Sequence, residues 1–83
     1  MNKTKLSLIV PNDFLAVVLR VLSKHQCETV RVAKAVDSNS WFFIHTLVPA
    51  KREVKKISRW VRALVALHPD YKELKTPVVE VES

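Results

Sequence analysis

The chain has 83 residues, of which 48% are apolar, and carries a formal net charge of +6. This size allows one small domain, and this apolar share argues against intrinsic disorder. The chain contains no glycine, which excludes the glycine-rich phosphate loops of nucleotide-binding enzymes and the GXXG clamp of KH-type RNA-binding domains.

The first half of the chain predicts a strand, a helix and a second strand. Residues 5–10 alternate imperfectly up to Pro11 and predict a strand. Residues 13–25 place leucines and valines at helical spacing, and Asn12 or Asp13 is available as the N-cap. Residues 28–36 alternate valines with other side chains, which is typical of a strand.

The second half repeats this order as strand, helix and strand. Residues 37–40 form a polar turn cluster, and residues 41–48 are rich in aromatic and β-branched side chains, so residues 28–48 predict a hairpin. An amphipathic helix is predicted over residues 51–68 and ends before Pro69. Residues 77–82, PVVEVE, predict a final edge strand.

The predicted order is therefore β-α-β-β-α-β across one domain, residues 1–83. Two right-handed βαβ crossovers give a four-stranded antiparallel sheet with two helices on one face. This α+β arrangement is ferredoxin-like.

The helix over residues 51–68 holds most of the net charge. It has six cations and one acid, Glu53, so its formal charge is +5 against +6 for the whole chain. Like charges three and four residues apart destabilise a helix, so their retention favours an anionic partner over a plain solvated face. We expect nucleic acid, or an acidic protein surface, to bind five of these cations: Arg52, Lys55, Lys56, Arg59 and Arg62.

Three consecutive aromatic residues begin the strand over residues 41–48. Alternation places Trp41 and Phe43 together, on the open sheet face near Arg31 if Phe42 faces the helices. This arrangement resembles RNA-recognition domains, which share the strand order and stack bases on aromatic side chains of their third strand. Three roles stay open for this pair: base stacking, burial in a dimer interface and packing within the chain.

Residues 8–47 resemble an ACT domain, a small regulatory module of amino-acid metabolism. The resemblance lies in LIVPNDFLAVVLRVLSKHQCETVRVAKAV and the strand after the turn, with a helix of the type LxxVLxxLxxxG. At the two positions where the family usually has glycine, this chain has Asp13-Phe14 and Gln26. The resemblance implies a dimer that binds a small metabolite or an enzyme subunit.

The sequence contains no recognisable motif for metal binding or catalysis. No Cys/His spacing matches a zinc site, and no nucleophile, base and orienting acid can be placed together, so we expect no metal, cofactor or catalysis. A single cysteine, Cys27, indicates a reducing compartment. The longest apolar run, residues 14–19, is too short to span a membrane. We therefore expect a cytoplasmic, non-catalytic binding module that forms a homodimer.

Overall fold

The structure is a computed structural model that describes residues 3–35, 40–74 and 77–82. All six predicted strands and helices are present in the predicted order. The elements are β1 (Thr4–Pro11), α1 (Asn12–Lys24), β2 (Glu28–Lys34), β3 (Trp41–Val48), α2 (Lys51–Ala66), the 3₁₀ turn η1 (Tyr71–Glu73) and β4 (Val79–Glu82). Residues 37–39 of the predicted turn, and the predicted end of the second strand at residue 36, lie outside the described residues.

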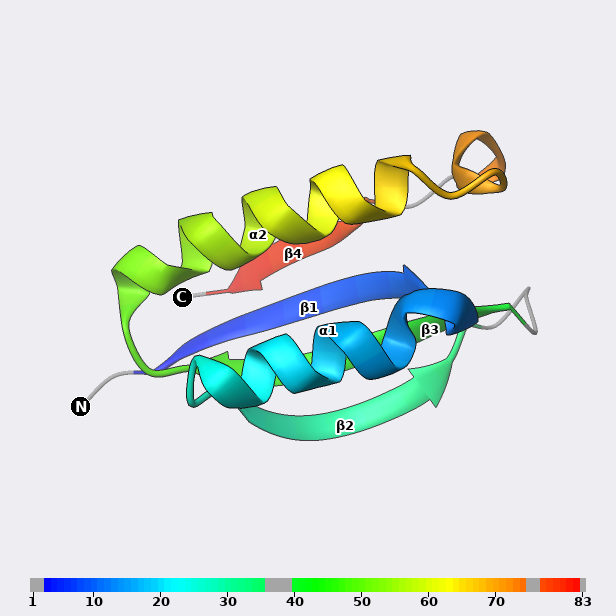
Figure 1. Ribbon diagram of the computed structural model, residues 1–83. Coiled ribbons are helices and arrows are strands. Elements are labelled where there is room, and N and C mark those ends of the chain that lie inside the picture. The colour runs from blue at the N-terminus through cyan, green and yellow to red at the C-terminus, as the bar shows by residue number, and fades with distance from the viewer. Residues whose placement is uncertain (1–2, 36–39, 75–76, 83) are drawn as a thin grey trace.

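The four strands form one antiparallel sheet in the order β2-β3-β1-β4. β1 and β3 lie at its centre, whereas β2 and β4 are its edges. Figure 1 shows both helices on the same face of the sheet, with α2 beside β1 and β4 and α1 nearer β2 and β3. The prediction of an α+β chain with a four-stranded antiparallel sheet and two helices on one face is confirmed.

The core lies between this sheet face and the two helices. Alternation along β1 points Leu6, Leu8 and Val10 toward the helices, where each is almost completely buried. Val18 of α1 and Val61 of α2 are buried against them. Burying one such side chain stabilises a fold by about 1.5–3 kcal/mol, so this layer fixes both helices on the sheet.

The start of α1 differs from its prediction. The N-cap residue is Pro11, without a side-chain cap, and neither Asn12 nor Asp13 fills that role. The backbone N–H of Asn12 instead donates to the carbonyl of Ser40 at 2.7 Å, which ties the helix start to the beginning of β3. The carboxylate of Asp13 contacts the ring of His68, from the segment that follows α2.

The end of α1 forms a Schellman motif without glycine. Gln26 has a φ of 60°, in the left-handed region that glycine usually occupies. The N–H of Gln26 donates to the carbonyl of Ser23 at 3.0 Å, and that of Cys27 to the carbonyl of Leu22 at 2.9 Å. These two bonds satisfy carbonyls at the helix end and turn the chain into β2.

The helix α2 ends at Ala66, two residues earlier than predicted. Pro69 disfavours a helical conformation of the residue before it, and the last N–H groups bond three residues back instead of four. Leu67, which the periodicity placed on the apolar face, is therefore 79% exposed. In the described part of the chain, no helix is long and apolar enough to cross a bilayer.

Candidate functional site

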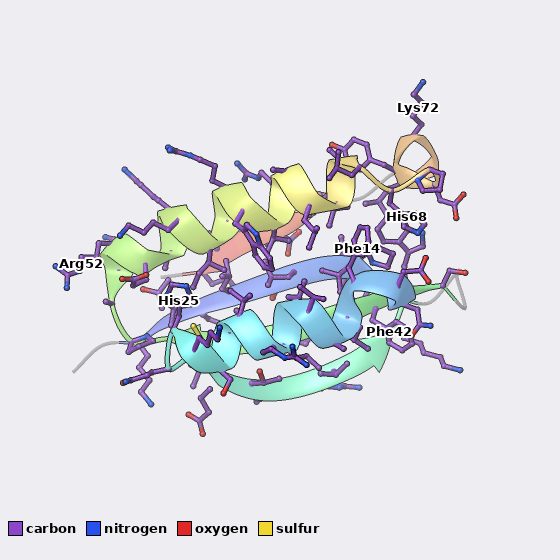
Figure 2. The ribbon with its side chains drawn as sticks, in the orientation of Figure 1. Phe14, His25, Phe42, Arg52, His68 and Lys72 are labelled. Carbon is purple, nitrogen blue, oxygen red and sulfur yellow. The ribbon has the colours of Figure 1, made fainter. Side chains whose placement is uncertain are left out.

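The outer face of α2 is basic and accessible along its whole length. All five cations predicted to bind an anionic partner are exposed on this face, and Lys51 is exposed beside them. Arg52 points away from the sheet at the N-terminal end of the helix (Figure 2). We call this surface the basic face; its residues are Lys51, Arg52, Lys55, Lys56, Arg59 and Arg62.

Among the described residues, no carboxylate pairs with a side chain of the basic face. The ion pairs seen in residues 3–35, 40–74 and 77–82 join Lys3 to Glu28, and histidines to acids elsewhere in the fold. The geometry of β4 explains part of this. Val81 lies opposite the buried Leu6, on the helix side of the sheet, whereas Glu80 and Glu82 alternate onto the other side. Those two carboxylates therefore do not pair with the cations of α2.

A groove of about 330 Å³ runs between α2 and β4. Cationic and apolar side chains line it together with the residue Ser58: Val54, Lys55, Ser58, Arg59, Arg62 and Val81. Ser58 is only 7% exposed, and its Oγ has no hydrogen-bond partner among the described residues. The groove therefore extends the basic face down to the edge of the sheet.

The open face of the sheet carries a second, smaller group of candidate residues. The half-buried ring of Phe43 stacks with that of His45, with centroids 6.4 Å apart and planes at 13°. Arg31 of β2 lies opposite His45 and is exposed. Arg31 and Phe43 thus lie near each other on the open face, as expected, but this face is on the other side of the sheet from α2.

The structure corrects the expected position of Trp41. Its side chain is 6% exposed, and its ring meets that of His68 edge-on, with centroids 5.5 Å apart. Phe14 of α1 meets the same imidazole at the same centroid distance. Of the three roles left open for Trp41, packing within the chain is the one that the structure shows, so this ring is not presented for base stacking.

His25, Cys27 and Glu53 form a further cluster of titratable groups, at the end of the molecule opposite His68. His25 Nδ1 lies 3.1 Å from Glu53 Oε2, within ion-pair distance but without the geometry of a hydrogen bond. Burial, and secondarily the charge of Glu53, raises the pKa of the Cys27 thiol. Reactive cysteines have lowered pKa values, and the shift at Cys27 runs in the opposite direction. Among the described residues, no group of three or more His, Cys, Asp or Glu side chains is arranged to hold a metal ion.

No protein-family model, curated protein or solved structure matches this chain.

Two residues of the site escaped the sequence reasoning. Ser58 is a hydroxyl residue on the inner side of an amphipathic helix, flanked at helical spacing by Val54 and Val61, and this break in the apolar pattern was a usable signal. Val81 had no such signal, because its position in the groove depends on which edge of the sheet β4 occupies.

Proposed function

We propose that this protein is a non-catalytic binding module whose basic face holds the phosphates of a nucleic acid. The observation that supports the proposal is the exposure of Arg52, Lys55, Lys56, Arg59 and Arg62 without a partner carboxylate among the described residues. Charges gathered on one helix produce a stronger local field than the same charges scattered over a surface.

Binding proceeds by neutralisation of phosphates and release of their counterions. From Arg52 to Arg62 the helix rises about 15 Å, a length over which one strand of B-form DNA presents about four phosphates. Lysine and arginine contacts to phosphates fix position and carry little sequence information. We therefore expect affinity with little base preference.

Arg31 and Phe43 are secondary candidates on the open sheet face. The partly exposed ring of Phe43 offers a stacking surface, and Arg31 supplies a cation near it. Because these residues lie across the sheet from α2, only a strand that passes around an edge of the sheet reaches both surfaces.

Reversal of two central charges tests this proposal. The variant K55E/R59E is expected to lose binding to a fluorescent oligonucleotide in an anisotropy titration, because two phosphate contacts become repulsive. The matched control R20E/K72E makes the same change of net charge at exposed positions outside the basic face. Equal affinity of wild type and K55E/R59E, or an equal loss in both variants, would reject the proposal.

We propose, as a second candidate, an ACT-like regulatory module on a ferredoxin-like sheet. One observation favours it: Gln26 has a positive φ at the position where the family usually has glycine. This function predicts that an amino acid raises the melting temperature in a thermal-shift screen. No shift with any of the twenty amino acids would remove it.

We further propose that the protein forms a homodimer, because apolar side chains of α1 and the edge strand β2 are exposed: Val17, Val30 and Val32. We also propose a reducing cytoplasmic compartment, because the buried Cys27 is a free thiol. Light scattering after gel filtration decides between a monomer and a dimer.

A further inference from the structure

The groove between α2 and β4 has a feature that packing alone does not explain. Ser58 is more than nine-tenths buried in the middle of a helix, and its hydroxyl has no partner among the described residues. A buried hydroxyl without a hydrogen bond destabilises a protein, and serine is a poorer helix former than alanine. An alanine at position 58 would avoid both costs, which points to a ligand for the hydroxyl.

The charges around Ser58 indicate what kind of ligand this is. Lys55, Arg59 and Arg62 line the same groove, and among the described residues no carboxylate lines it. A phosphate monoester carries a charge of about −1.5 to −2 at neutral pH and offers three strong acceptor oxygens, whereas a phosphodiester within a strand carries about −1. Guanidinium groups match phosphate oxygens in bidentate geometry. Three cations and a hydroxyl therefore suit a monoester better than a diester.

We propose that this groove binds the terminal phosphate monoester of a nucleic-acid strand. The inference rests on the proposed function and adds a preference for strand ends. The Ser58 hydroxyl donates to a phosphate oxygen after a rotation of its side chain, and the three cations neutralise the charge. Val54 and Val81 form the apolar part of the groove and contact the adjoining sugar.

The charges also argue against a second copy of the chain as the occupant. Pairing through the free edge of β4 would place the Lys55, Arg59 and Arg62 side chains of two copies close to each other. Like charges brought together at an interface cost several kcal/mol of binding free energy. An anionic occupant relieves this repulsion, whereas a second copy creates it.

The test compares single-stranded oligonucleotides of one sequence that carry a 5′-phosphate, a 3′-phosphate or hydroxyls at both ends. We expect one phosphorylated form to bind wild type about tenfold more tightly than the hydroxyl form, the size of one hydrogen bond to a charged group. The two phosphorylated forms distinguish the two strand ends. Inorganic phosphate is expected to compete for the groove and so to reduce this tenfold difference in affinity.

Two variants assign this difference in affinity to the groove. S58A is expected to lose most of the tenfold preference while its melting temperature stays equal or rises, a combination that a purely structural serine would not give. V81E places a carboxylate in the groove at a half-exposed position and is expected to abolish the preference, whereas V30E, on the exposed edge strand β2, retains it.

The outcomes separate this inference from the proposed function. If all three oligonucleotides bind wild type equally, the terminal-phosphate site is wrong although the basic face still binds nucleic acid. If S58A and V81E keep the full preference, the phosphate lies elsewhere and the inference is likewise overturned. If no oligonucleotide binds at all, the proposed function itself fails.

Discussion

At the scale of single residues, Gln26 shows how the absence of glycine affects the stability of a helix end. Its φ of 60° closes the Schellman motif after α1. A left-handed conformation costs a residue with a side chain about 1–2 kcal/mol, whereas glycine adopts it freely but loses more entropy on folding. We expect Q26G to stabilise the protein by about 0.5–1 kcal/mol in a urea titration.

An alanine at the same position provides the control. Q26A keeps a Cβ in the left-handed region and is expected to leave the free energy of unfolding within about 0.5 kcal/mol of wild type. Were Q26G less stable than Q26A, the positive φ at this turn would be wrong.

At the scale of elements, α2 combines a well-anchored apolar side with a basic face that works against its own stability. Arg52, Lys55 and Arg59 are spaced three and four residues apart, and each such like-charge pair costs about 0.2–0.5 kcal/mol. We therefore expect K55E/R59E to melt at the wild-type temperature or slightly above it, measured by circular dichroism. A large drop in its melting temperature would mean that these cations support the fold, and a loss of binding could then no longer be assigned to the partner.

Most of α2 could be predicted from the sequence because helical periodicity is a local property. The spacing of Val54, Ile57 and Val61 gave the buried side, and the cations between them gave the exposed side. Leu67 was misplaced because the helix ends one residue before it. The groove could not be predicted, since it requires the packing of α2 against a strand far away in the sequence.

At the scale of the whole molecule, His68 joins the end of α2 to the start of α1. Its Nε2–H donates to Asp13 Oδ2 at 3.0 Å, while its Nδ1 accepts the backbone N–H of Asp70 at 3.2 Å. The rings of Phe14 and Trp41 enclose it. Figure 2 shows His68 beside Phe14 at one end of the molecule and His25 at the other.

This arrangement predicts unequal effects of removing the two histidines. H68A loses a hydrogen bond to a charged group and buried packing, so we expect it to destabilise the fold by about 2–4 kcal/mol. H25A loses only a partly exposed contact with Glu53 and is expected to cost less than about 1 kcal/mol. Urea denaturation of the two variants measures the difference, and similar losses would contradict the role of His68.

His68 also explains why the position of Trp41 could not be predicted from the sequence. Alternation along β3 predicted the open-face position of Phe43 but misplaced Trp41, because His68 comes from a segment 27 positions further along the chain and covers the end of the sheet. The order of the elements along the chain, the antiparallel sheet and the placement of both helices on one face followed from local patterns and general rules of chain connection. Contacts such as that of Asp13 with His68 join residues far apart in the chain, so no local sequence pattern predicts them.

The salt dependence of nucleic-acid binding tests the central role of the basic face most directly. With about four phosphates contacted, the logarithm of the affinity should fall with the logarithm of salt concentration with a slope of about −3 for a single strand. In K55E/R59E any remaining binding should show a markedly shallower slope. A wild-type slope near zero, or the same steep slope in both proteins, would show that the basic face of α2 does not hold the phosphates.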